Sequence, residues 1–149
     1  GGSITILNPA PAQPLGENIL RLCDFVTPNE IEAEQITGIP VKTISDAEVA
    51  ADKLLEKGAS AAVITLGEQG ALFKDSKQIV HQPSFQVGPI VETTGAGDAF
   101  NGGLAVALAE EMPIDKALRF ACATASISVT RPGTAPSMPD RNEIDTLLT

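Results

Sequence analysis

The sequence contains no tryptophan and no tyrosine, and only five phenylalanines among 149 residues. Proteins that bind single-stranded nucleic acid without sequence preference stack bases on aromatic side chains, so this class is disfavoured. Basic residues are also few: ten Lys and Arg stand against nineteen Asp and Glu, giving a formal net charge of −9. This balance disfavours binding to nucleic acid or to an anionic membrane. A phosphate ligand would have to be bound locally, through backbone N–H groups, a helix end or a metal ion.

Cysteine and histidine are scarce as well. Cys23 and Cys122 lie far apart in the sequence, each beside apolar residues, which predicts two buried, reduced thiols. His81 is the one histidine, so a zinc site of cysteine and histidine has too few ligands. The apolar runs are short and interrupted, and nothing resembles a signal peptide or a membrane span. We therefore expect a soluble, cytoplasmic protein with no membrane partner.

Apolar, β-branched segments alternate with helical patterns along the chain. Extended segments are predicted at 3–8, 24–26, 60–66, 71–75 and 89–93, with one or two more, broken by a proline, within 77–87. Helices are predicted at 15–23, 30–37 and 45–57, from the glycine turn to about 110, and at 112–130 and 141–148. In the helix at 45–57, Ser45 and Glu48 have the spacing of a capping box, and Gly58 is the expected stop. The alternation predicts one α/β domain over residues 1–149, with a mostly parallel sheet. Because a strand is predicted almost at the first residue, we expect that further elements precede it.

Three turns follow predicted strands: TPNE at 27–30, TLGEQG at 65–70 and TTGAGD at 93–98. Ligands of parallel α/β sheets bind at the carboxyl ends of the strands. In the third turn, Gly95, Ala96 and Gly97 lack bulky side chains, so the backbone can expose consecutive N–H groups. Together with the unpaired N–H groups of the helix's first turn, these donors would form an anion pocket. Asp98 stands at its rim, where a base that takes a proton from an attacking hydroxyl is needed for phosphoryl transfer.

A plain helix cap with glycines for tight packing is the alternative interpretation of this motif. The motif is no Walker A loop, because no Gly-Lys-Ser/Thr follows it. It is no Rossmann fingerprint either, because Phe100 stands where the third glycine belongs.

The segment ETTGAGDAFNGG at 92–103 resembles the second signature of the ribokinase family, the sugar kinases of the phosphofructokinase-B type. The segments LNPAPA, DFVTPNEIEAEQITG, VITLGEQGALF and VTRPGTAPSMP resemble the same family in the same order. The resemblance covers essentially the whole chain and corresponds to the C-terminal half of family members. It implies a three-layer, Rossmann-like α/β fold whose mostly parallel sheet is flanked by helices and which lacks the N-terminal half, the β lid and most sugar contacts.

The resemblance also implies roles for individual residues. Asp98 matches the catalytic base, and Gly95, Ala96 and Gly97 match the anion hole. ATP with magnesium is the implied cofactor, with Glu32 acting indirectly on the metal. The residues that match nucleotide-binding positions are Asn29, Glu32, Thr65, Gly67, Gly70, Ala121 and Thr124. The turn with Thr65 and Gly67 would contact the nucleotide phosphates, and the stretch that begins around Ala121 would flank adenine. Each has a simpler alternative: Asn29 as a helix cap, Glu32 as a solvated helix acid, and Thr65 with Gly67 as a strand-end turn.

Members of this kind are activated by a monovalent cation, usually potassium. The positions that match its cage are Glu92, Thr94, Ser128, Arg131, Gly133 and Ser137. The family usually has Asp where this chain has Glu92, and the extra methylene changes the reach of the carboxylate. Arg131 and Gly133 as ordinary loop residues are the alternative interpretation.

Three functional hypotheses follow. The first is an ATP-dependent kinase that phosphorylates the primary hydroxyl of ribose. The second is an isolated nucleotide-binding half that needs a second copy or a complementing N-terminal half, because substrate positioning supplies much of such catalysis. The third is a folded fragment that binds nothing well. Turnover would favour the first hypothesis, ATP binding without turnover the second, and the absence of both binding and turnover the third.

Overall fold

The computed structural model of the chain describes residues 2–149. The chain folds into two compact units, one ending at His81 and the other formed by Gln82–Thr149. The expectation of one domain over residues 1–149 stays a prediction.

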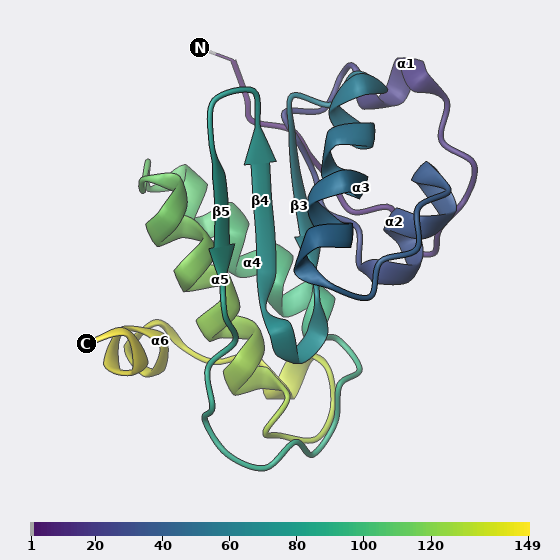
Figure 1. Ribbon diagram of the computed structural model, residues 1–149. Helices are drawn as coiled ribbons and strands as arrows, with labels where there is room; N and C mark the ends of the chain where they lie inside the picture. Colours follow the sequence, from purple (N-terminus) through teal and green to yellow (C-terminus); the bar gives the residue numbers. More distant parts are fainter. Residues whose placement is uncertain (1) are drawn as a thin grey trace. The chain divides into compact units, whose positions relative to one another are not determined.

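The first unit contains a sheet of five strands in the order β1–β2–β3–β4–β5. The strands β3, β4 and β5 are labelled in Figure 1. The strands are β1 (Ile6–Leu7), β2 (Phe25–Val26), β3 (Ala61–Thr65), β4 (Ala71–Asp75) and β5 (Ile79–Gln82). The β1–β2 and β2–β3 pairs are parallel, and the β3–β4 pair is antiparallel. The sheet is therefore mixed. The change of direction follows from the short connection between β3 and β4, because a parallel pair needs a long crossover.

Three helices belong to this unit: α1 (Glu17–Leu20), α2 (Glu30–Thr37) and α3 (Ile44–Glu56). α2 and α3 lie on one face of the sheet beside β3 (Figure 1). The apolar stripe of α3 and the strands share a core in which Val26, Leu54, Ile64 and Leu72 are almost fully buried. α2 ends as the sequence predicts, because Gly38 adopts the left-handed conformation at its C-cap (φ 76°).

The predicted capping box of α3 is wrong. Thr43, not Ser45, is the N-cap: its hydroxyl accepts a hydrogen bond from the Asp46 N–H, and the Asp46 carboxylate accepts one from the Thr43 N–H. Asp46 also accepts a hydrogen bond from the Lys42 N–H. The sequence offers two overlapping boxes, and the carboxylate of Asp46 satisfies two backbone donors at the earlier one.

Several predicted segments are shorter than expected. The strand at 3–8 is reduced to β1, and the helix at 15–23 is reduced to α1. The segment at 89–93 forms no strand in the described part of the chain. Instead, the N–H groups of Val91 and Glu92 both donate to the Val129 carbonyl, at 2.8 and 3.2 Å. The C-cap of α5, not a neighbouring strand, therefore accepts the hydrogen bonds of these two residues.

The second unit is helical. It contains α4 (Ala96–Ala109), α5 (Ile114–Ser128), a short 3-10 turn at Ala135–Ser137, and α6 (Arg141–Leu148). α4 packs against α5, and α5 packs against α6. The two helices α4 and α5 approach closely at Gly103, where an added Cβ would lie 2.7 Å from the Thr124 hydroxyl oxygen and 3.1 Å from the Ala121 Cα. Glycine at this position lets the two helix backbones come together.

Candidate functional site

The TTGAGD turn leads directly into α4. Gly95 is the N-cap and has a left-handed backbone (φ 85°), which glycine adopts without steric cost. The Ala96 N–H donates to the Thr93 carbonyl at 3.1 Å, so this donor is already used. Gly97 and Asp98 occupy the first helical turn, where N–H groups have no carbonyl within the helix to bond. An added Cβ at Gly97 would meet nothing within 4 Å, so the backbone there is open to a ligand.

Asp98 is exposed on the first turn of α4. Among residues 2–149 its carboxylate has no hydrogen-bond or ion-pair partner. One neighbour on this turn was missed by the sequence reasoning: the Asn101 side-chain amide donates to the Gly97 carbonyl at 2.9 Å. The GDAFN spacing, which places Asn101 four residues after Gly97, was the available signal.

The loop before α4 meets the loop after α5. The Glu92 carboxylate accepts a hydrogen bond from the Gly133 N–H at 2.8 Å. Thr134 lies next to Gly95, since a Cβ at Gly95 would be 3.1 Å from the Thr134 methyl carbon. The structure thus brings the predicted cation-site residues Glu92 and Gly133 together, beside the turn that begins α4.

The other predicted cation ligands have local partners. The hydroxyls of Ser128 and Ser137 donate to the carbonyls of residues three positions earlier, at 2.8 and 2.6 Å. The Arg131 guanidinium is paired with the Glu143 carboxylate, and this hydrogen bond raises the pKa of Arg131 and lowers that of Glu143. Thr94 is exposed. The two serine oxygens keep lone pairs for a cation, whereas the Arg131 side chain is turned to Glu143.

In the first unit, Asn29 and Glu32 form a reciprocal capping box. The Glu32 N–H donates to the Asn29 side-chain oxygen at 2.8 Å, and the Asn29 N–H donates to the Glu32 carboxylate at 2.9 Å. The cap interpretation of Asn29 is therefore correct as a description of its local contacts. Glu32 is no solvated helix acid, because it is only 8% exposed.

The predicted phosphate turn stands beside this cap. Asn29 and Thr65 form a parallel β-bridge, and the Thr65 N–H donates to the Pro28 carbonyl at 3.0 Å. Gly67 and Gly70 both have positive φ, 53° and 91°. The carboxyl ends of β2 and β3 thus lie next to each other, as the parallel pairing requires. The predicted residues Asn29, Glu32, Thr65, Gly67 and Gly70 belong to these two neighbouring strand ends.

Ala121 and Thr124, predicted to flank adenine, lie on α5 where it packs against α4. Ala121 is fully buried, and the Thr124 hydroxyl donates to the Phe120 carbonyl at 2.8 Å. Both positions face Gly103. Their observed contacts are helix packing, and a role in nucleotide binding stays a prediction.

A pocket of about 350 Å³ opens in the second unit between α4, α5 and α6. We call it the α4–α6 pocket, and its lining includes Asp98, Gly102, Val106, Phe120, Met138 and Ile144. Arg141 forms part of the same wall and lies over the Phe120 ring, 5.1 Å from its centroid. The sequence reasoning missed this pocket, because no local motif marks a space between three helices.

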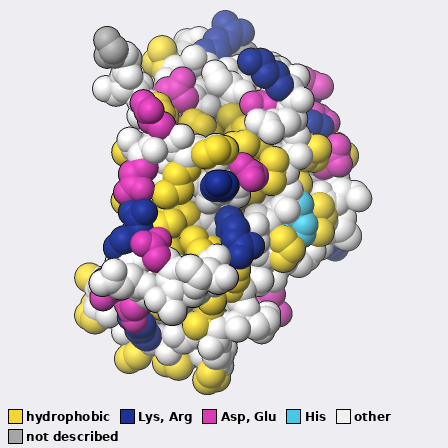
Figure 2. Space-filling view, turned by 90° about the vertical axis from the view of Figure 1, so that its left-hand side faces the viewer, with side chains coloured by type: hydrophobic (Ala, Val, Ile, Leu, Met, Phe, Trp, Pro, Cys, Tyr) yellow, Lys and Arg dark blue, Asp and Glu magenta, His cyan; other side chains and the backbone are white. Residues whose placement is uncertain are grey.

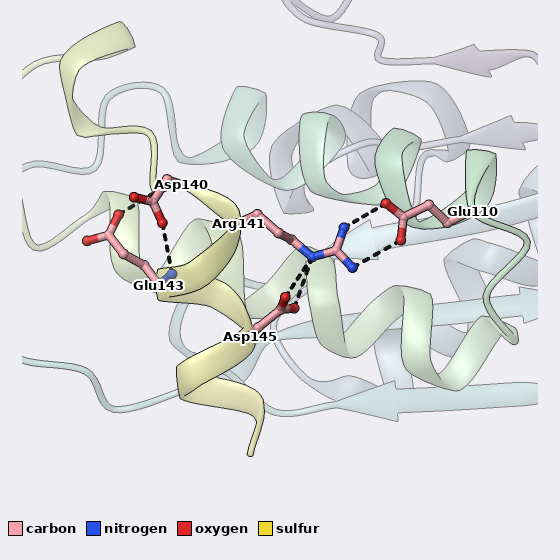
Figure 3. Close-up of polar contacts among 5 residues, drawn as sticks. All are labelled: Glu110, Asp140, Arg141, Glu143 and Asp145. Atoms are coloured by element: carbon pink, nitrogen blue, oxygen red, sulfur yellow. Dashed lines mark hydrogen bonds and ion pairs between the residues drawn. The ribbon is translucent and has the colours of Figure 1, made fainter.

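Arg141 is held by two acids (Figure 3). Its guanidinium donates to both carboxylate oxygens of Glu110, at 2.6 and 3.1 Å, and to the Asp145 carboxylate at 3.0 Å. These bonds raise the pKa of Arg141 and lower that of Glu110. They join α6 to the end of α4, so the wall of the pocket is fixed.

Charge and metal-binding groups are dispersed. On the face shown in Figure 2, basic side chains lie among acidic and hydrophobic ones. In the part of the chain that the structure describes, no three His, Cys, Asp or Glu side chains gather closely enough to hold a metal ion. No helix within residues 2–149 is both long enough and apolar enough to span a bilayer. Cys23 and Cys122 are both buried free thiols, as predicted, and burial raises the pKa of Cys122 to about 12.

Comparison with known proteins adds independent information. A sequence profile of the pfkB family carbohydrate kinases matches residues 2–141. The chain is 44% identical over 144 residues to the ribokinase of Haemophilus influenzae, covering 95% of this chain and 46% of the relative. It is 40% identical over 148 residues to the deoxyribokinase of Salmonella typhi, covering 99% of this chain and 48% of the relative.

A solved structure agrees with these relatives. Arabidopsis thaliana ribokinase, determined with ribose and ATP, superposes with a TM-score of 0.93 at 33% identity, over 98% of this chain and 47% of that protein. This match confirms the predicted fold class. The chain spans about half the length of the relatives it matches.

Proposed function

The chain belongs to the pfkB family of carbohydrate kinases, and we propose that it transfers the γ-phosphoryl group of ATP to the primary hydroxyl of ribose. One observation carries the proposal. The Asp98 carboxylate is exposed and has no partner among the described residues, on the first turn of a helix that begins with a left-handed glycine. The Glu32 and Asp46 carboxylates accept backbone hydrogen bonds at helix caps, whereas the Asp98 carboxylate remains available to a ligand.

In the proposed reaction, Asp98 accepts the proton of the sugar hydroxyl. The hydroxyl oxygen then bonds to the γ-phosphorus, and the bond from that phosphorus to the bridging oxygen of ADP breaks. The products are the sugar phosphate and ADP. The first-turn N–H groups of Gly97 and Asp98 are donors for the charge on the transferred group, and Gly95 gives the turn its shape.

The Ala96 N–H contributes less in the present conformation, since it donates to the Thr93 carbonyl. A ligand would have to displace that 3.1 Å bond before this donor could join the anion hole.

The nucleotide phosphates would bind near the ends of β2 and β3, at Thr65, Gly67 and Gly70. Positive φ at the two glycines supports this assignment, because backbone N–H groups in such turns converge on anions. Magnesium would be held mainly by the phosphates, with Glu32 acting indirectly through the cap it forms with Asn29. Ala121 and Thr124 remain the proposed neighbours of adenine.

A potassium ion would be held at the joined loops that contain Glu92 and Gly133. The Glu92 carboxylate and the oxygens of Thr94, Ser128 and Ser137 are hard donors that suit such an ion. Arg131 could contribute only its backbone carbonyl, since its guanidinium is cationic and paired with Glu143. The ion would supply fixed positive charge beside the N-terminus of α4.

Ribose is proposed over deoxyribose because the 44% identical relative is a ribokinase, against 40% for the deoxyribokinase. The second candidate function is a nucleotide-binding half that turns over only with a complementing half or a second copy. This second candidate is supported by the length of the match, because the chain aligns with only 46% of the ribokinase relative.

The test measures ADP formation with magnesium-ATP, potassium and ribose, together with ATP binding by titration calorimetry. Asp98→Asn should lower turnover about 100-fold or more while ATP still binds. Asp115→Asn is the matched control, because Asp115 is also an exposed acid in the first turn of a helix of the same unit.

Equal turnover of the two variants would contradict the role of Asp98. ATP binding without turnover in the unmodified chain would favour the nucleotide-binding half. Neither binding nor turnover would leave a folded fragment without function of its own.

A further inference from the structure

His81 is the single histidine of the chain, and it lies on β5, which follows β4 in the order of the sheet (Figure 1). Its ring nitrogen Nε2 lies 2.7 Å from the Gln69 carbonyl oxygen. A carbonyl oxygen can only accept a hydrogen bond, so Nε2 carries the hydrogen and donates it. The imidazole therefore reaches from β5 to the turn between β3 and β4.

This turn, residues 66–70, is the β3–β4 turn, and we have assigned it to the nucleotide phosphates. It consists of a short 3-10 helix, Gly67–Gln69, with Leu66 before it and Gly70 after it. The Gln69 N–H donates to the Leu66 carbonyl at 2.9 Å, and the Gly70 N–H donates to the Gly67 carbonyl at 3.1 Å. The directions in which the backbone N–H groups point depend on these two bonds.

The bond from His81 acts on the last peptide of the turn. The Gln69 carbonyl and the Gly70 N–H belong to one peptide plane, so a contact that holds the carbonyl also fixes the direction of the N–H. Gly70 has a φ of 91° and a ψ of −128°, a conformation that residues with a Cβ rarely adopt. The same freedom of glycine would let an unheld peptide rotate by half a turn. That rotation would break the bond from Gly70 to Gly67 and open the turn.

A second contact on Gln69 is weaker. Its side-chain amide donates to the Lys42 carbonyl at 3.4 Å, near the upper limit for a hydrogen bond, and the Gln69 side chain is exposed. The His81 ring is half-buried, and its bond is the shorter of the two. It also comes from a strand, whose position the sheet fixes, and a site is held more precisely by strands than by loops.

We propose that His81 is a positioning residue of the nucleotide site. Its Nε2–H holds the Gln69–Gly70 peptide, and through it the backbone N–H groups of the β3–β4 turn, in the conformation that receives the nucleotide phosphates. His81 acts through the turn and makes no contact with the nucleotide itself. This inference rests on the proposed function, because that function assigns the turn to the phosphates.

The test compares two replacements of His81 in this chain. His81→Gln keeps a donor, because the amide nitrogen of glutamine reaches about as far from the backbone as Nε2, whereas His81→Leu removes it. Gln78→Leu is the matched control, because Gln78 is an exposed polar residue directly before the same strand. Titration calorimetry with magnesium-ATP should give a Kd about 3- to 10-fold higher for His81→Leu. His81→Gln and Gln78→Leu should stay within about twofold of the unmodified chain.

A second readout needs no nucleotide. Exchange of the Gly70 N–H with solvent deuterium, followed by NMR, reports how often its bond to the Gly67 carbonyl opens. Exchange should be about 3- to 10-fold faster in His81→Leu, and His81→Gln should restore the slow rate. Both measurements are made well below the melting midpoint of every variant, so that the chain stays folded.

Equal ATP affinity of His81→Leu and the unmodified chain would overturn the proposal, and it would leave the proposed function intact. A loss of affinity that His81→Gln does not restore would overturn it as well, because the hydrogen-bond donor would then not be the group that matters. If the unmodified chain binds no ATP, the proposed function fails. The exchange of the Gly70 N–H alone then decides whether His81 holds the turn.

Discussion

The carboxylate of Glu92 accepts a hydrogen bond from the backbone N–H of Gly133, 2.8 Å away in space and 41 positions away in sequence. The bond ties the loop before α4 to the loop after α5. Gly133 has a left-handed backbone (φ 84°), so the N–H reaches the carboxylate from a turn that most residues would strain. The same contact lies at the proposed potassium site.

Glu92→Gln should abolish stabilisation by potassium. The amide keeps the length of the side chain and can still accept from the Gly133 N–H, but it lacks the negative charge that holds the ion. We expect the melting midpoint of the unmodified chain to rise with potassium chloride relative to tetramethylammonium chloride, and that of the variant to stay constant. Glu34→Gln, an exposed acid on α2, is the control and should keep the response. A potassium response in Glu92→Gln equal to that of the control would contradict the site.

Gly95→Ala should destabilise the protein by about 1–2 kcal/mol, because alanine pays a steric penalty in the left-handed region. The added methyl would also lie 3.1 Å from the Thr134 side chain. Gly97→Ala, two residues later, has open space and a helical backbone, so it should be neutral or stabilising. Urea unfolding of the pair measures the difference. Equal stability of the Gly95→Ala and Gly97→Ala variants would contradict this prediction, because it would mean that the turn accepts alanine without strain.

Gly103→Ala should lower the free energy of unfolding by about 1–3 kcal/mol. The new methyl would lie 2.7 Å from the Thr124 hydroxyl oxygen and 3.1 Å from the Ala121 Cα, so α4 and α5 would have to separate. The neighbouring Gly102→Ala should raise the free energy of unfolding by about 0.5–1 kcal/mol, because nothing lies within 4 Å. Opposite signs at adjacent positions are the expected result of denaturant unfolding, and equal signs would mean that the two helices are not closely packed at Gly103.

Acid should weaken the contact between α6 and α4. The pKa of Glu110 is lowered in the folded state by its hydrogen bonds to Arg141. The pair therefore contributes stability above the ordinary carboxyl pKa of about 4.3, and this contribution is lost as the pH falls through the lower folded value. Glu110→Gln should be less stable than the unmodified chain at pH 7. The difference between their free energies of unfolding, which we call the gap, should narrow below about pH 4.

Urea unfolding at a series of pH values measures that gap. Asp115→Asn should show no comparable gap at pH 7, because Asp115 has no ion-pair partner among the described residues. A gap for Glu110→Gln that stays constant down to pH 3 would show that the ion pair adds nothing that protonation removes.

Much of the fold was predictable from local signals. Gly38 ends α2 because only glycine adopts its φ of 76° without strain, and Asn29 begins that helix because its side chain caps the N-terminus. α4 and α6 lie where the sequence predicts helices. The segment ETTGAGDAFNGG and four further segments in the same order identified the family by resemblance, and the comparisons confirm it. These features depend on neighbours within a few residues, so the sequence alone determined them.

Only the tertiary structure decided the rest. Two overlapping capping boxes precede α3, and the choice of Thr43 over Ser45 depends on which backbone donors the Asp46 carboxylate can reach. The segment at 89–93 could extend a sheet by its composition, but the N–H groups of Val91 and Glu92 bond to the carbonyl of Val129, the C-cap residue of α5. The contact between Glu92 and Gly133, and the α4–α6 pocket with Arg141 in its wall, join residues tens of positions apart. Such contacts depend on how helices pack in space, and no local pattern in the sequence encodes that packing.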